Sequence, residues 1–287
     1  MEPPRTLSLS GPVLVDAHVH FYRCYRPEPF LDGALANFHR LAARLGLPPR
    51  TPGILCLTET AEDDWFRSLR DGVVSHALGR WTVHPTEEDG SLIARRGEDD
   101  ETLVLIAGRQ IAAREGLEVL AIGMEDDLPD GQPLRRTIER VLALGGVPVV
   151  PWGFGKWWFR RGRIVRELIE RPPRGRLFLG DNGGRPREFG DPPLFAYGRR
   201  RGIWTLPGSD PLPFPSHERR AGSNGFVLEG TFDLTHPCTA LKERLRTLAE
   251  QPPIYGEGEA VLPFLRHQVL MQLRKRARPP RRMPSHW

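Results

Sequence analysis

The sequence predicts a single α/β domain built on a parallel, barrel-like sheet. Apolar segments typical of strands alternate with amphipathic segments typical of helices along most of the 287 residues. Six predicted strands end in polar or glycine-rich residues, and parallel α/β folds gather their functional sites at the carboxyl ends of strands. The content of 39% hydrophobic and 27% charged residues allows one large domain or two small ones, and we expect one domain over residues 1–278.

The first unit is a strand, a helix and a second strand. Residues 13–20, VLVDAHVH, alternate along a strand, so that Leu14, Asp16, His18 and His20 share one face. The unit is completed by a helix over residues 30–45 and a buried strand within residues 54–60.

Between Trp81 and Met124 the pattern changes to antiparallel ribbons. Apolar segments at 91–97, 102–111 and 117–124 are separated by the tight turns EDDE and REG. The regular alternation of strands and helices then resumes. Strands are expected within residues 147–152, 176–182, 202–210 and 224–233, and helices within 133–144, 163–171, 239–250 and 257–276.

His18 and His20 indicate a metal site. Two imidazoles at positions i and i+2 of one strand can converge on a divalent cation at about 2.0–2.1 Å, a geometry that ions such as Zn²⁺ accept. The alternative is a pair of histidines that form hydrogen bonds at the end of a strand. Asp16, two residues earlier on the same face, favours the metal because carboxylates commonly orient ligating histidines.

Charge and cysteine content limit the class of protein. The net charge is +5, arginine supplies most of the cations, and residues 279–287 form an Arg- and Pro-rich tail that we expect to be disordered. Nucleic acid is not the expected partner, although contact of the tail with phosphate stays open. The three cysteines form no CxxC pair, and no segment resembles a signal peptide or the ~20 apolar residues of a membrane span. We therefore expect a cytoplasmic protein that enters no membrane.

The ends of the predicted strands form an ordered series: DAHVH, TET, GRQ, PWG, DN and GSDPL. This series resembles the PHP (polymerase and histidinol phosphatase) family, whose strand ends carry DxHxH, TDH, GxE followed by a hairpin, HP, an Asn or His, and GSDAH. The resemblance covers about residues 13–212, and the HxH with a late GSD is its most specific part. It implies a distorted TIM-like (β/α)7 barrel with an antiparallel hairpin excursion, and hydrolysis of phosphate esters with up to three metal ions.

Several ligand positions of that family are changed. By this resemblance His18, His20 and Asp210 are retained metal ligands. Three family histidines are replaced, by Thr60, Trp152 and Leu212. At least two metal positions are therefore expected to be lost, which leaves one divalent ion (Zn, Mn or Fe) or none.

The bridging Glu of the family falls on Gln110, because the REG hairpin follows this residue as it does in the family. Glu125 is the rival if the register slips. A neutral amide cannot offset the charge of two cations as a carboxylate does, so Gln110 fits a single ion or none. Glu59 or Glu125 could complete the ligand shell or act as the catalytic base.

The segment 152–162, WGFGKWWFRRG, has the most unusual composition in the chain. Its cations are the expected binding residues for an anionic group: Lys156, Arg160 and Arg161. Trp157 and Trp158 could stack on a ring, or the segment could simply cover one end of the barrel. In a second polar loop, His217 is a replacement ligand, an acid or a surface residue.

The favoured function is a metal-dependent hydrolase of the phosphoesterase type, with a reduced single-ion site that acts on a small anionic substrate. The alternative is a catalytically inactive PHP-like pseudoenzyme that binds a ligand or a protein. A third interpretation is an amidohydrolase-like hydrolase, but no histidine lies between His84 and His217, where that family needs later ligands. A carboxylate near the imidazoles would favour the enzyme, and Trp152 in the metal cavity would favour the pseudoenzyme. The substrate and the oligomeric state stay open.

Overall fold

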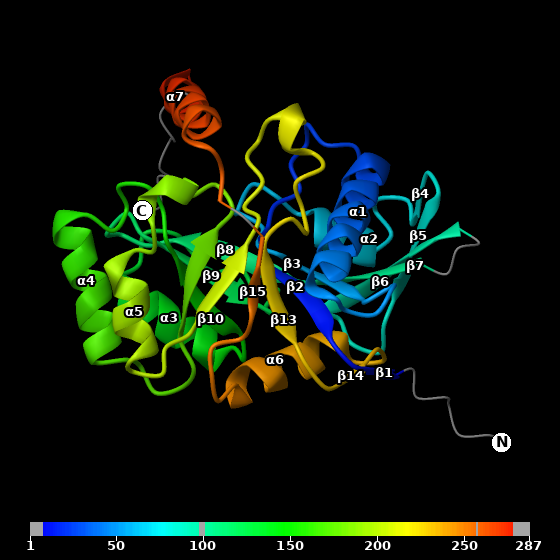
Figure 1. Cartoon of the computed structure of the whole chain (residues 1–287), viewed down its shortest axis with the longest axis horizontal. Helices are drawn as coiled ribbons and strands as arrows, with labels where there is room; N and C mark the ends of the chain where they lie inside the picture. Colours follow the sequence, from blue (N-terminus) through cyan, green and yellow to red (C-terminus); the bar gives the residue numbers. More distant parts are fainter. Residues whose placement is uncertain (1–7, 98–100, 257, 278–287) are drawn as a thin grey trace, which may run out of the picture.

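The chain folds into two mixed β-sheets that face each other across an apolar interior (Figure 1). The computed structural model describes residues 8–97, 101–256 and 258–277. The larger sheet has the strand order β15-β13-β2-β3-β7-β6-β5-β4. In that order its strands are Ile254–Tyr255, Gly225–Leu228, Val13–Val19, Gly53–Leu57, Glu101–Ile106, Ser91–Arg96, Trp81–Pro85 and Ala77–Leu78.

The smaller sheet has the strand order β12-β11-β10-β9-β8. In that order its strands are Thr205–Gly208, Phe178–Asn182, Val147–Pro151, Glu118–Ile122 and Gly108–Ala112. Strands β10, β11 and β12 are parallel, whereas β9 runs antiparallel to both of its neighbours. A separate antiparallel pair consists of β1 (Ser8–Ser10) and β14 (Thr231–Asp233).

The predicted distorted TIM-like (β/α)7 barrel is wrong, because the described sheets do not close into a barrel. Within the described residues the strand ladders fall into separate sheets, and the chain passes from β7 to β8 through the single residue Ala107. An isolated bridge joins Glu59 and Arg109 on this side, and on the other side the N–H of Asp210 donates to the His18 carbonyl oxygen at 2.8 Å. The antiparallel ribbons β4 to β7 and β8 to β9 stand where a parallel barrel needs helical crossovers, which explains the open arrangement.

The predicted strand–helix–strand unit is confirmed. Helix α1 (Pro27–Leu45) connects β2 to the parallel β3, and it begins earlier than predicted because proline suits the first turn of a helix. It ends at Gly46, whose φ of 67° is a left-handed conformation that glycine adopts without strain. The antiparallel ribbons between Trp81 and Met124 are also confirmed.

The other described α-helices are α2 (Trp65–Arg70), α3 (Leu134–Ala143), α4 (Phe159–Glu170), α5 (Pro193–Arg199), α6 (Pro237–Thr247) and α7 (Val261–Ala277). Helices α2 and α5 were not predicted, because six or seven residues are too few to show a helical period.

Apolar side chains form three packed layers. The inner layer lies between the sheets, and α6 contributes Leu241 and Leu245 to it from below the strands in Figure 1. Helices α1 and α2 cover the outer face of the larger sheet, and α3, α4 and α5 cover the outer face of the smaller one. Helix α7 lies at the top of the molecule in Figure 1, and its Phe264 packs against Phe154 and Phe189.

The Arg- and Pro-rich tail predicted over residues 279–287 lies outside the described residues. Among the helices of the described part, none combines the length and the apolar character needed to cross a membrane.

Candidate metal centre

A register shift in β2 turns His18 and His20 toward the space between the sheets. Strict alternation would place Leu14 and Val19 on opposite faces of the strand, yet both pack in the outer layer with α1. The pairing of β2 with β3 slips between Asp16 and Val19, which adds one residue to β2 and reverses the alternation. Since His18 and His20 flank Val19, they point away from the outer layer.

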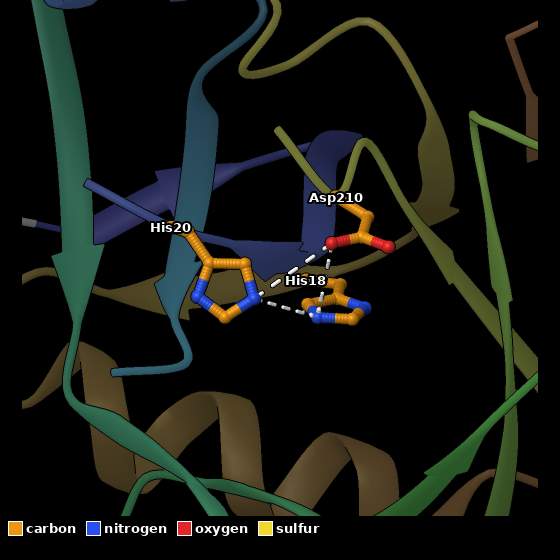
Figure 2. A group of neighbouring side chains, drawn as sticks. All are labelled: His18, His20 and Asp210. Carbon is orange, nitrogen blue, oxygen red and sulfur yellow. Dashed lines mark hydrogen bonds and ion pairs between the residues drawn. The ribbon is translucent and has the colours of Figure 1, made fainter. Parts of the chain in front are cut away.

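Two imidazoles, one carboxylate and one amide converge at this point. His18 Nε2 lies 3.0 Å from His20 Nε2 and 3.2 Å from Gln110 Oε1. Asp210 Oδ1 lies 3.6 Å from His18 Nε2 and 3.7 Å from His20 Nε2 (Figure 2). The histidines belong to β2, Gln110 belongs to β8, and Asp210 follows β12, so both sheets contribute to the centre.

This donor set fits a divalent cation. Ligand atoms of a tetrahedral ion at about 2.0–2.1 Å stand about 3.3 Å from one another, which is close to the distances between these nitrogen and oxygen atoms. Among the described residues, Nδ1 of neither ring has a hydrogen-bond partner. Each ring can therefore carry its hydrogen on Nδ1 and keep a lone pair on Nε2 for an ion. The ring of Tyr22 stacks on His20, with 5.3 Å between the centroids, and holds that imidazole in place.

Burial and neighbouring charges set the protonation states of the ligands. Burial lowers the pKa of His20 to about 4, and His18 adds to the effect, so His20 is neutral near pH 7. Burial alone would raise the pKa of Asp210, but the adjacent imidazoles and Lys156 hold that pKa below its usual value. A neutral imidazole beside an ionised carboxylate is the state in which both groups bind a divalent metal.

The loop after β12 is fixed against β2 by backbone contacts. Asp210 has a φ of 45°, in the left-handed region that Asp tolerates better than most residues. Asp16 Oδ1 accepts the N–H of Ser209 at 2.9 Å, and its Oδ2 accepts the N–H of Gly222 at 2.8 Å. Asp16 therefore positions the backbone around the site, and its described hydrogen bonds are not the contacts with imidazole rings that the sequence analysis expected.

A carboxylate that the sequence analysis missed lies beside the centre. Glu118, at the start of β9, forms an ion pair with Lys156, with 2.5 Å between Oε2 and Nζ. Burial would raise the pKa of Glu118, but Lys156 holds it below its usual value, and the negative charge acts on His20. Gln110 pairs with Leu120 across the β8–β9 hairpin, so residues 110 and 118 share one face of the sheet. The register of this predicted hairpin was the signal that could have identified Glu118.

The two carboxylates predicted to complete the centre have other partners. Glu59 is buried, its Oε1 accepts the N–H of Phe66 at 2.9 Å, and its Oε2 lies 3.7 Å from Arg109 Nη1. Burial raises the pKa of Glu59 to about 7. Glu125 pairs with Arg70 through its carboxylate. No described contact brings Glu59 or Glu125 to the imidazoles.

The three predicted anion-binding cations have different described contacts. Lys156 pairs with Glu118 and acts electrostatically on Asp210. Arg160 is exposed at the start of α4, and Arg161 donates to the carbonyl oxygen of Gly155 at 2.7 Å. The described contacts therefore link Lys156 to the candidate centre, and the roles of the two arginines stay a prediction.

A second group of possible ligands lines a small cavity together with Asp210. His217 Nε2 lies 3.1 Å from His267 Nε2, and His217 is buried rather than at the surface. Unlike the first pair, these rings have partners at Nδ1: Leu212 N–H donates to His217 at 3.1 Å, and His267 lies 3.1 Å from Glu259 Oε2. The Leu212 contact places the hydrogen of a neutral His217 on Nε2, where it is donated to His267. This cluster is satisfied by its own hydrogen bonds.

Comparison with known proteins gives a fold relationship. The sequence matches no protein-family model, and a search of curated proteins finds no match. Among solved structures, PsfC from Pseudomonas syringae PB-5123 is similar with a TM-score of 0.50 and 15% identity, over 93% of this chain and 98% of PsfC. The lesion-specific endonuclease PfuEndoQ from Pyrococcus furiosus gives a TM-score of 0.46 and 13% identity, over 85% of this chain and 57% of the endonuclease. At this identity, PsfC shows a shared fold alone.

Proposed function

We propose that this protein is a metal-dependent hydrolase of the phosphoester type, with a single divalent ion held by His18, His20 and Asp210. The observation that carries the proposal is the convergence of two Nε2 atoms, 3.0 Å apart, on a carboxylate from the facing sheet. The resemblance of DAHVH and GSDPL to the strand ends of the PHP family supports the choice of phosphate esters. When bound, a divalent cation supplies a Lewis acid and an activated water molecule for hydrolysis.

The remaining residues of the centre have distinct roles in this proposal. Lys156 attracts the anionic group of the substrate, since its ammonium acts electrostatically on Asp210. Gln110 offers an amide oxygen beside His18 Nε2. Glu118 is ionised and takes the role of proton acceptor that the sequence analysis gave to Glu59 or Glu125.

A second candidate function is that of a catalytically inactive binding module. It is favoured by the partners of the two predicted catalytic carboxylates, because Glu59 lies against Arg109 and Glu125 pairs with Arg70. In that case the imidazoles and Asp210 form a polar cluster that stabilises the junction between the sheets.

The metal content of the purified protein distinguishes the two functions. We expect about one Zn, Mn or Fe per chain by elemental mass spectrometry, as a single three-ligand site requires, and loss of this ion in the double variant His18→Ala/His20→Ala. The variant His267→Ala is the matched control, because the rings of its cluster have hydrogen-bond partners at Nδ1. It should retain the ion.

The ion-loaded protein should also hydrolyse 4-nitrophenyl phosphate, and the double variant should lack this activity. Wild-type protein without metal, even after incubation with excess Zn²⁺ or Mn²⁺, would exclude the hydrolase and leave the binding module. Loss of the ion in His267→Ala alone would move the site to the second histidine pair.

A further inference from the structure

An aromatic cavity lies beside the candidate metal centre. Its volume is about 360 Å³, within the range of small-molecule sites. Its walls include Trp152, Phe154, Trp157, Trp158, Phe189 and Leu194. The cavity lies between the segment after β10 and the residues that precede and begin α5.

Three of the rings remain exposed to solvent. The exposed fractions are 38% for Phe154, 51% for Trp158 and 50% for Phe189. Phe154 lies 4.9 Å from Trp158 and 6.0 Å from Phe189 between ring centroids. Clustered exposed rings on the rim of a cavity are costly in water, and such patches commonly mark binding sites.

The aromatic cavity shares a wall with the small cavity that contains Asp210. Trp152 and Phe154 line it on one side and also line the small cavity that contains Asp210. The Trp152 carbonyl accepts the side-chain amide of Asn182 at 3.1 Å, which fixes this shared wall. Lys156 lies in the same segment, between Phe154 and Trp158, and it acts electrostatically on Asp210, so one loop carries both the rings of the cavity and a cation of the candidate centre.

We propose that this cavity binds the planar aromatic ring of the substrate whose anionic group occupies the metal centre. The inference rests on the proposed function for the position of the anion, and it narrows the substrate class to small aryl or heteroaryl phosphate esters. A planar ring stacks on Trp158 and Phe189 and removes their apolar surface from water. The ion pair of Arg185 with Asp191, 3.0 Å apart at the rim, offers polar contacts to the edge of a heterocycle.

The test compares phenylphosphonate with methylphosphonate, which share the anionic group and resist hydrolysis. Calorimetric titration of the Zn²⁺-incubated protein is expected to give a Kd for phenylphosphonate about tenfold lower than that for methylphosphonate, as one stacked ring provides. Trp158→Ala should remove this difference. Phe159→Ala is the matched control, because Phe159 is 89% exposed and does not line the cavity.

Equal affinity for the two phosphonates, or a difference that survives in Trp158→Ala, would overturn the aromatic site. So would sedimentation evidence for a Trp158-dependent dimer, because a second copy would then be the occupant. Metal content measured on the same samples separates failure of the aromatic site from failure of the proposed hydrolase function. If the protein lacks metal but binds phenylphosphonate through Trp158, the aromatic site stands while the hydrolase fails.

Discussion

The pairs His18/His20 and His217/His267 have nearly equal Nε2 separations of 3.0 and 3.1 Å. They differ in which ring nitrogens have hydrogen-bond partners, and therefore in which nitrogen is free to bind an ion. His18 and His20 lack Nδ1 partners among the described residues, whereas His217 accepts a backbone N–H there. The HxH spacing was enough to predict the first pair as candidate ligands. The partner of His217 is His267, which lies 50 residues away on α7, so no local pattern could reveal it.

Glu59 gives a prediction for stability as a function of pH. Because burial raises its pKa from 4.5 to about 7, the folded protein holds this proton more tightly than the unfolded chain does. The stability linked to Glu59 is therefore complete below pH 4.5 and lost as the pH rises through 7, on the order of 3 kcal/mol at 1.36 kcal/mol per pH unit. In Glu59→Gln this loss is absent, so the unfolding free energy of the variant relative to wild type should be higher at pH 8 than at pH 5.

Urea unfolding at the two pH values measures this difference. Glu243 is exposed on α6, so Glu243→Gln is the control. Its free energy of unfolding should differ from that of wild type by the same amount at pH 5 and at pH 8. If Glu59→Gln instead lost stability relative to wild type between pH 5 and pH 8, the raised pKa of Glu59 in the folded protein would be contradicted.

The bulge in β2 is the feature of secondary structure that positions the site. Period-two alternation predicted the strand correctly and placed Asp16 on the face of the histidines, but the register shift separates them. Asp16 turns to the backbone of Ser209 and Gly222 as a result. Such a shift depends on pairing with β3 and on the approach of β12, which are tertiary contacts that a strand pattern does not contain.

Gly208, the last residue of β12, allows this close approach. A Cβ at this position would lie 2.3 Å from the backbone nitrogen of His18 and 2.8 Å from Asp16 Oδ1. Gly208→Ala should therefore push Asp210 away from the imidazoles and weaken Zn²⁺ binding by about tenfold or more, as misplaced ligand supports do. Zinc titration against a chelating dye measures the effect, with circular dichroism to verify folding.

Gly184→Ala is the control, because its Cβ would make only an ordinary contact of 3.5 Å with Asn182. Equal zinc affinity in wild type and in a folded Gly208→Ala variant would show that the contact between β2 and β12 does not hold the centre.

The whole molecule differs from the predicted barrel because strand pairing is decided by contacts between distant segments. The sequence was sufficient to predict the β2–α1–β3 unit and the hairpins, since each depends on local alternation and turns. It was not sufficient to predict that the β8–β9 hairpin would join β10 in a second sheet. Glu118 was missed for the same reason. The sequence analysis treated the β8–β9 hairpin as an excursion from the barrel, whereas this hairpin forms one wall of the site.

Helix α7 is expected to open independently of the two sheets. Phe264 is its buried anchor, with its ring 5.1 Å from Phe154 and 5.9 Å from Phe189, whereas Leu262, Leu265 and Val269 are exposed. A helix of 17 residues is marginal without tertiary contacts, so Phe264→Ala should release it locally. Amide exchange in α7 should then accelerate by about tenfold or more, while exchange in α1 and the melting temperature stay near wild-type values.

Hydrogen exchange followed by mass spectrometry resolves the two helices, and Leu262→Ala, at a position 79% exposed, should leave both rates unchanged. Acceleration in α1 as well as α7 would mean that the helix folds as one cooperative unit with the sheets. In that case Phe154 and Phe189, whose rings contact Phe264, would lose this contact only when the whole protein unfolds.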